Sequence, residues 1–227
     1  MTSFFKVVGA SLCLGFLGAS CQTSGVPVTD LLLEAQPRSI LVLPPLDETV
    51  ETNAIYGAYS SVTIPLAESG YYVFPVALVN AIMLQNGLPT PYEMHSVPLS
   101  KLVEIFDPDA VLYLTVTNWG TSYQVINSAT TISMTGRLVD ADTGALLWEG
   151  NETLQQNSSS AGGGLAGMLV GALVNQVATS ISDPSRDIAR AANWNLLTGR
   201  QRGWILGPYH PDVEADLTDI REARLAR

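Results

Sequence analysis

Apolar residues in the first half of the chain form short continuous runs that alternate with segments of helical spacing. The run at residues 39–46 has strand length and contains two prolines near its end, which is typical of a strand buried on both faces of a sheet. Residues 52–69 predict a helix with a break near Pro65, and residues 71–74 predict a second short strand. Residues 75–87 predict a further helix that runs from a proline to a glycine. This β-α-β-α order favours parallel strands joined by right-handed crossovers.

The period of the pattern changes in the second half. Residues 88–98 contain three prolines and predict a loop, and residues 99–106 predict a short helix. Apolar and polar residues then alternate over residues 110–119 and again over 132–138, and a further strand follows at 145–154. Such alternation is typical of half-buried antiparallel strands. The expected fold class is therefore α/β (α+β), a mixed sheet with parallel N-terminal strands, an antiparallel C-terminal meander and helices packed on it.

One long stretch between Glu152 and Asp183 carries no charged residue. Its glycines at positions 163, 167 and 171 recur every four residues, so a helix over residues 161–181 would present a face of small residues to a neighbouring helix, sheet or second copy. This packing face would consist of Gly163, Gly167 and Gly171. A flexible glycine-rich loop and membrane insertion during assembly are the alternatives. Residues 184–197 then predict a final amphipathic helix.

The first 21 residues resemble a bacterial lipoprotein signal. Lys6 precedes an uncharged run at residues 7–17, and these 11 residues rise only about 16 Å as a helix, too short for a hydrocarbon core of about 30 Å. Small residues lead to Cys21, the expected site of lipidation, and an ordinary secretory signal with an incidental cysteine is the alternative. Acyl chains contribute about 0.8 kcal/mol per buried methylene, so a lipidated Cys21 would hold the protein at the membrane permanently. Gln22, in place of an aspartate that retains lipoproteins at the inner membrane, favours the outer membrane.

Four regions are therefore expected along the chain. They are a signal peptide at residues 1–20, a lipidated tether at 21–37, an α/β periplasmic domain at 38–198 and a C-terminal extension at 199–227.

Charge is distributed unevenly over these regions. Residues 22–182 contain three basic side chains and 14 acidic ones, in a chain whose formal net charge is −10. An acidic body disfavours nucleic acid as a partner. The C-terminal extension is richer in arginine, which would form pairs within the chain or meet an acidic partner. Trp204 lies close to Arg200 and Arg202, so these three residues are candidates for contact with a partner.

Candidate catalytic or metal-binding groups are few. The mature chain keeps no cysteine except Cys21, which excludes disulfides and free-thiol chemistry. Its two histidines, His95 and His210, lie in proline-flanked segments, where surface positions are expected. Carboxylate pairs at 107–109 and 140–142 lack the ligand series of a calcium loop, so turn and capping roles are expected for them. We therefore predict no catalytic residue, no metal and no cofactor.

Several short motifs together resemble one family of bacterial proteins. They are the cysteine at 21, the segments 39–46 and 65–76, Asn86–Gly87, Asp109–Tyr113, Asn118–Gly120, Leu138–Asp140, Thr143–Gly144, Leu147–Trp148 and Gly207–Pro208. The family comprises small bacterial lipoproteins of unknown function, known as surface antigens and as companions of a CsgG-like lipoprotein. The resemblance covers residues 21–209. It implies a fold similar to the TolB N-terminal domain, a CsgG-like partner and no known enzyme activity.

The expected function is that of a non-enzymatic, lipid-anchored scaffold or assembly component of an envelope secretion or transport complex. The domain would lie in the periplasm at the outer membrane, with a second copy of the chain as a further partner. A binding module for a glycan, a peptidoglycan fragment or a small ligand is the second interpretation, and a cleft lined by aromatic side chains would favour it. An envelope hydrolase is the third, and it would need two carboxylates or a His and Ser pair within hydrogen-bond reach in a cleft.

Overall fold

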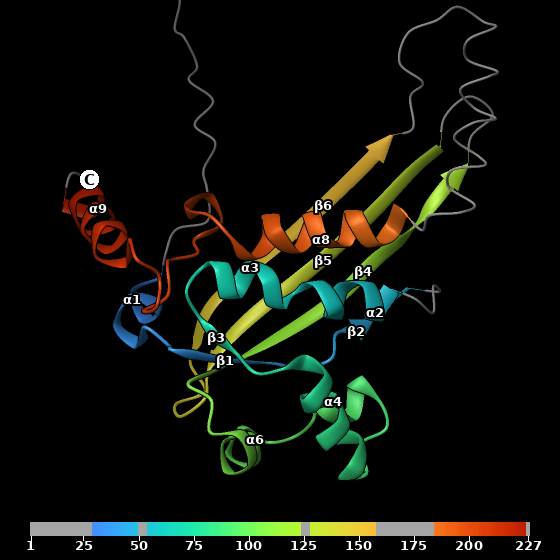
Figure 1. Ribbon diagram of the computed structural model, residues 1–227, viewed down its shortest axis with the longest axis horizontal. Helices are drawn as coiled ribbons and strands as arrows, with labels where there is room; N and C mark the ends of the chain where they lie inside the picture. The colour runs from blue at the N-terminus through green and yellow to red at the C-terminus, as the bar shows by residue number, and fades with distance from the viewer. Residues whose placement is uncertain (1–28, 50–53, 124–127, 158–183, 226–227) are drawn as a thin grey trace, which may run out of the picture.

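The computed structural model describes residues 29–49, 54–123, 128–157 and 184–225 (Figure 1). Within these residues a mixed sheet runs in the order β3-β1-β4-β5-β6, and β2 pairs with β4 outside this path. The strands are β1 (Ser39–Val42), β2 (Leu46–Asp47), β3 (Tyr72–Val73), β4 (Ala110–Tyr123), β5 (Ser128–Asp140) and β6 (Leu146–Asn157). The predicted α/β class with a mixed sheet is confirmed.

Helices lie on both sides of this sheet (Figure 1). In chain order they are α1 (Asp30–Ala35), α2 (Ala54–Ser61), α3 (Thr63–Glu68), α4 (Val76–Gln85), α5 (Pro91–His95), α6 (Leu99–Phe106), α8 (Pro184–Leu197) and α9 (Val213–Leu225), with a 3₁₀ turn at Arg200–Arg202. Helices α2, α3 and α8 pack on one face, whereas α4, α5 and α6 lie on the other.

Strand β1 runs through the core. Ile40, Leu41, Val42 and the following Leu43 are all fully buried, because β1 lies between two parallel neighbours, β3 and β4. Ile40 and Val42 belong to the hydrophobic cluster beneath α2, α3 and α8, and Leu41 and Leu43 belong to the cluster beneath α4, α5 and α6. The prediction of a strand buried on both faces is confirmed.

Two local predictions need correction. The helical segment after β1 breaks at Val62, between α2 and α3, and Pro65 lies in the first turn of α3, where its missing N–H leaves no helix hydrogen bond unmade. The segment predicted as a loop contains α5, which begins with a capping box. In that box the side chain of Thr90 accepts from the backbone of Glu93, and the side chain of Glu93 accepts from the backbone of Thr90.

Strands β4, β5 and β6 form the predicted antiparallel meander. Strands β4 and β5 pair from Ala110 opposite Asp140 as far as Tyr123 opposite Ser128. One face of the meander is apolar and packs under α2 and α8. The opposite face carries threonine, serine, tyrosine and arginine side chains, most of them exposed or half-buried among the residues described.

Both ends of the described chain join the core. Leu32 of α1 is fully buried, and Trp204 and Leu217 belong to the same hydrophobic cluster. The folded unit therefore extends on both sides of residues 38–198. Within the described ranges, no helix combines the length and apolar character that a membrane span requires. Cys21 and the predicted packing face, Gly163, Gly167 and Gly171, lie outside the described residues.

Candidate functional site

A groove of about 580 Å³ lies between α2, α4 and α5, and we call it the α2–α4 groove. Its lining is predominantly apolar and aromatic, with polar contributions from Ser60 and Asn80. None of the described residues that line it is charged. Its main apolar side chains are Ile55, Tyr56, Val76, Leu84, Met94 and Trp119. An uncharged groove in a chain of net charge −10 suits an uncharged or apolar occupant.

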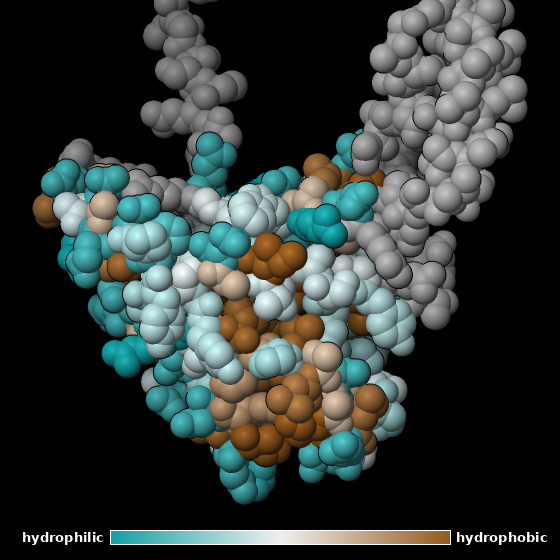
Figure 2. Space-filling model, in the orientation of Figure 1, coloured by the Kyte–Doolittle hydropathy of each residue, from teal (hydrophilic) through white to brown (hydrophobic). Residues whose placement is uncertain are grey.

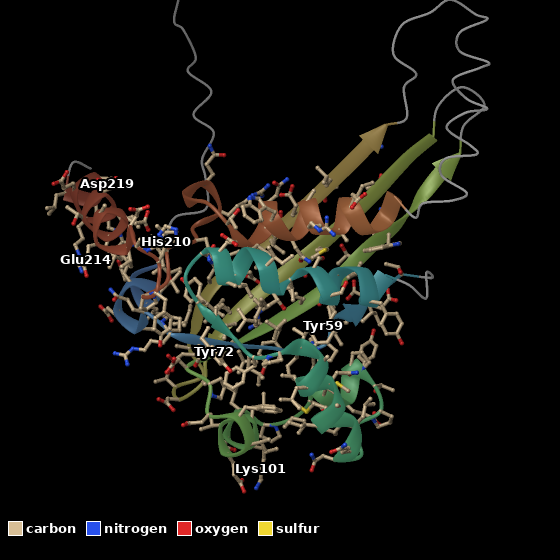
Figure 3. All side chains as sticks on the ribbon, in the orientation of Figure 1. Tyr59, Tyr72, Lys101, His210, Glu214 and Asp219 are labelled. Atoms are coloured by element: carbon tan, nitrogen blue, oxygen red, sulfur yellow. The ribbon has the colours of Figure 1, made fainter. Side chains whose placement is uncertain are left out.

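Two aromatic side chains shape this groove. Gly57 of α2 lets the ring of Trp119 approach closely, because a Cβ at position 57 would lie 2.4 Å from the Cη2 atom of that ring. Tyr59, labelled in Figure 3, donates its hydroxyl to the backbone carbonyl of Val76 at 2.9 Å, which joins α2 to the start of α4. Burial raises the pKa of the Tyr59 hydroxyl, so it stays protonated and acts as a structural donor.

Large apolar side chains are exposed on the groove helices α2, α4 and α5, and on β3 and α6. Six of them are 47 to 69% exposed: Tyr56, Tyr72, Leu78, Leu84, Tyr92 and Ile105. We call this set the apolar surface. Figure 2 shows hydrophobic side chains gathered over the lower part of the molecule, where Figure 1 places α4. Extended apolar surface on a folded domain is typical of a site of contact with another molecule.

A second hollow, of about 410 Å³, lies on the opposite side of α5 against the uncovered face of β4 and β5. We call it the His95 pocket. Tyr113 and Thr115 of β4 line it, directly opposite Arg137 and Thr135 of β5 in the strand register. His95 closes one side, where its Nε2–H donates to the backbone carbonyl of Pro44 at 2.8 Å. His95 is thus half-buried, which corrects the expected surface position.

Burial sets the protonation of the groups in this pocket. Desolvation lowers the pKa of His95 despite its hydrogen bond to the Pro44 carbonyl, so its imidazole is neutral at pH 7. Desolvation also raises the pKa of the Tyr113 hydroxyl, and the nearby charge of Arg137 opposes this effect. The Nε of Arg137 lies 3.8 Å from the Oε1 of Glu149 on the next strand, and both side chains are more than half exposed. Such a surface pair contributes little stability.

Trp204, a candidate for partner contact, is a core residue. It is 2% exposed, and its ring packs edge-on against Trp148 and Tyr71 with centroid distances of 4.7 and 5.8 Å. The prediction of an exposed contact residue is therefore corrected. The ring is buried by side chains that are distant from it in sequence.

Arg202 is engaged within the chain. It forms an ion pair with Glu152 of β6, whose side chain is 6% exposed, and it also donates to the carbonyl of Asn151 at 2.9 Å. The backbone carbonyl of Arg202 in turn accepts from the indole of Trp148 at 2.6 Å. These contacts hold the residues after α8 against β6, which agrees with pairing inside the chain. The side chain of Arg200 lies outside the described residues.

One carboxylate of each pair, Asp109 and Asp140, has the turn or capping role that the sequence predicts. Asp109 accepts from the backbone N–H groups of Arg38 and Ser39 at 2.9 and 2.8 Å, which joins the start of β1 to the start of β4. Asp140 accepts from the backbone N–H of Thr143 at 2.8 Å in the turn before β6. In the described part of the chain, no group of three or more potential ligands could hold a metal ion.

His210 and the acidic residues Glu214 and Asp219 lie at the α9 end of the molecule, well away from the α2–α4 groove (Figure 3). The Nδ1 of His210 accepts from the backbone N–H of Asp212 at 3.1 Å, so this imidazole orders the turn before α9.

The sequence contains a local signal near the groove and the pocket that hydrophobic periodicity does not reveal. The Thr90 to Glu93 capping box marks the start of α5, and that helix brings Met94 into the groove and His95 into the pocket. For Trp204 the local signal is the apolar pair Ile205–Leu206 that follows it, whereas its ring neighbours Trp148 and Tyr71 are distant in sequence.

Comparison with known proteins gives consistent matches. A family model described as "Putative lipoprotein GNA1162-like" matches residues 29–209. A protein of Neisseria meningitidis serogroup B, named "Putative lipoprotein NMB1124/NMB1162", is 44% identical over 193 residues, which cover 84% of this chain and 90% of that protein. The crystal structure of lipoprotein GNA1162 from Neisseria meningitidis is 48% identical, with a TM-score of 0.53 over 63% of this chain and 99% of that chain.

Proposed function

We propose a function for this chain, which belongs to the GNA1162-like family of lipoproteins. The proposed function is that of a non-enzymatic, lipid-anchored scaffold or assembly component of a secretion or transport complex at the outer membrane. Cys21 carries the lipid, and the folded domain lies in the periplasm. A CsgG-like lipoprotein is the proposed partner, and a second copy of the chain is a further one.

The apolar surface is the observation that carries this proposal. Its side chains come from α2, β3, α4, α5 and α6, so contact with a partner would bury parts of several elements at once. Leu78 and Ile105 are each about half exposed, and burying one such side chain stabilises a complex by about 1 kcal/mol or more. Aromatic residues such as Tyr92 are typical anchors of protein interfaces.

Site-specific photocrosslinking of the lipidated, full-length protein in its native membrane tests the scaffold function. A photoreactive residue at Leu78 or Ile105 should form an adduct that mass spectrometry identifies as a CsgG-like lipoprotein or a second copy. Trp194 of α8 is the matched control, because it is 45% exposed on the other side of the sheet and should give no such adduct. Leu78→Glu should also reduce the adduct formed from position 105 at least fivefold. Equal adducts from all three positions, or none from Leu78 and Ile105, would contradict the proposal.

The α2–α4 groove supports a second candidate, a binding module for a glycan or small ligand. Tyr56 and Trp119 give it the aromatic lining that such a module uses, and Asn80 supplies an amide. A chito-oligosaccharide that binds there should change the protein's tryptophan fluorescence, and Tyr56→Ala should abolish the change. A fluorescence change that persists in Tyr56→Ala, or no change at millimolar oligosaccharide, would contradict glycan binding in the groove.

A further inference from the structure

The His95 pocket has a charge unlike that of its surroundings. Residues 22–182 contain only three basic side chains, and Arg137 is the single charged residue among the described residues that line the pocket. This guanidinium is therefore one of few positive charges on an acidic part of the chain. Arg137 lies in a hollow beside the half-buried Tyr113, and its side chain is 58% exposed, so a ligand from solution can reach it.

The donors of Arg137 are largely free within the described structure. Glu149 approaches its Nε only to 3.8 Å, which is longer than a hydrogen bond, and no side chain or carbonyl of the described residues accepts a hydrogen bond from the guanidinium. A planar guanidinium with free donors matches the geometry of a carboxylate, which it binds through two parallel hydrogen bonds.

The other residues that line the pocket add hydroxyl groups and apolar surface beside the guanidinium of Arg137. Thr115 and Thr135 lie directly opposite each other and place two hydroxyl groups on its floor. The ring of Tyr113 forms a wall, and His95 packs edge-on against that ring at a centroid distance of 5.2 Å. Leu46 and Val139 add apolar surface, so the pocket joins a cationic end to an apolar wall. Its volume lies within the range of about 300 to 1,000 Å³ that small-ligand sites occupy.

We propose that the His95 pocket binds the carboxylate of a small ligand with an apolar group beside it, such as the C-terminal residue of a peptide. Arg137 holds the carboxylate, Thr115 and Thr135 donate to it, and the wall of Tyr113 and Leu46 packs against the apolar group. A monoanion fits better than a phosphate dianion, because the pocket offers a single guanidinium, which can neutralise one negative charge and not two. The proposal is independent of the scaffold function, since the apolar surface and this pocket share no residue.

An NMR titration of the full-length mature protein in detergent tests this site. N-acetylalanine is the probe, and N-acetylalanine amide is its neutral control of the same shape. The backbone amides of Thr135 and Arg137 should shift on addition of the acid, with a dissociation constant in the millimolar range, and should not shift with the amide. Equal shifts with acid and amide would overturn the proposal, because the carboxylate would then contribute nothing.

Two substitutions should change the affinity in opposite directions. Arg137→Gln should weaken N-acetylalanine binding at least tenfold, because it removes the charged donor. Glu149→Gln should strengthen binding two- to fivefold, because it removes a carboxylate that competes for Arg137. Arg190→Gln is the matched control: Arg190 pairs with Asp187 on α8 at a similar exposure and should leave the affinity unchanged.

Three results would contradict the assignment. If Arg190→Gln weakens binding as much as Arg137→Gln, the effect is one of net charge and no specific site exists. If Glu149→Gln weakens binding, Glu149 takes part in the contact and the proposed geometry is wrong. If inorganic phosphate binds more tightly than N-acetylalanine and shifts the same amides, the ligand class is a phosphate instead of a carboxylate.

Discussion

At the level of single residues, the α2–α4 groove depends on the absence of one side chain. Gly57 lies in α2, where glycine is about 1 kcal/mol less favourable than alanine. Its position is explained by Trp119, whose ring occupies the space that a Cβ would fill. Gly57 therefore lowers the stability of the isolated helix but allows the ring of Trp119 to pack closely against α2. That ring forms a wall of the groove.

Gly57→Ala should lower the free energy of unfolding by about 1 kcal/mol. The new Cβ would lie 2.4 Å from the Trp119 ring, and such overpacking costs about 1 to 3 kcal/mol, which exceeds the gain in helix propensity. Gly120→Ala is the control, because nothing lies within 4 Å of a Cβ there, and its stability should be unchanged or slightly higher. Urea unfolding followed by circular dichroism measures both. A Gly57→Ala protein as stable as the unmodified one would show that Trp119 does not fill this space.

At the level of elements, the segment after α8 is tied to strand β6 and to the turn before β3. Glu152 is a buried carboxylate that receives the guanidinium of Arg202 and, at 3.2 Å, the side-chain amide of Asn195. Further along, the N–H of Gly207 donates to the carbonyl of Ser69 at 2.7 Å. A Cβ at Gly207 would lie 2.4 Å from the neighbouring backbone, so only glycine allows this approach. The segment is therefore an integral part of the fold.

Arg202→Met should destabilise the protein by about 2 to 3 kcal/mol. It leaves the charge of Glu152 buried without its cation, a loss that reaches about 3 to 5 kcal/mol when both partners are fully buried, and the side chain of Arg202 is 35% exposed. Adding Glu152→Gln to the same chain should restore most of the stability, because the buried charge is then gone. Chemical unfolding of the single and double variants measures the difference. Arg190→Met, which removes an exposed pair, should change stability by less than about 0.5 kcal/mol.

A double variant no more stable than Arg202→Met alone would mean that the arginine acts through packing of its stem and not through the carboxylate.

Most elements could be predicted from sequence because their patterns are local. The alternation of apolar and polar residues over 110–119 and 132–138 indicates a sheet with one buried face. The continuous apolar run at 39–46 indicates a strand buried on both faces. The burial of Trp204 was not predicted, because its ring contacts come from Trp148 and Tyr71, which are distant in sequence, and the preceding arginines and glycine are typical of a surface segment. The capping box at Thr90 marks the start of α5, but the groove and the His95 pocket could not be predicted from it, since each joins elements that are distant along the chain.

At the level of the whole molecule, the two ends of the described chain meet. Asp30 of α1 and Arg224 of α9 form an ion pair, and both helices lie on the same side of the molecule in Figure 1. Thr29 is eight residues after Cys21, so a lipid on Cys21 would attach within about 28 Å of this end. Helices α4 and α6 lie away from this end in Figure 1. If Cys21 carries a lipid, these two helices are therefore on a part of the domain distant from the point of attachment.

The cooperative unit should include the C-terminal residues, so a chain that ends at residue 198 should not fold. It loses Trp204, Ile205, Leu217 and Ile220, all buried in the main cluster, and each contributes about 1.5 to 3 kcal/mol by burial. Their sum equals much of the 5 to 15 kcal/mol that a domain of roughly this size has as net stability. A chain that ends at residue 225 is the control and should unfold as the full chain does. Thermal unfolding followed by near-ultraviolet circular dichroism distinguishes them, and a cooperative transition in the chain that ends at 198 would restore the boundary expected from sequence.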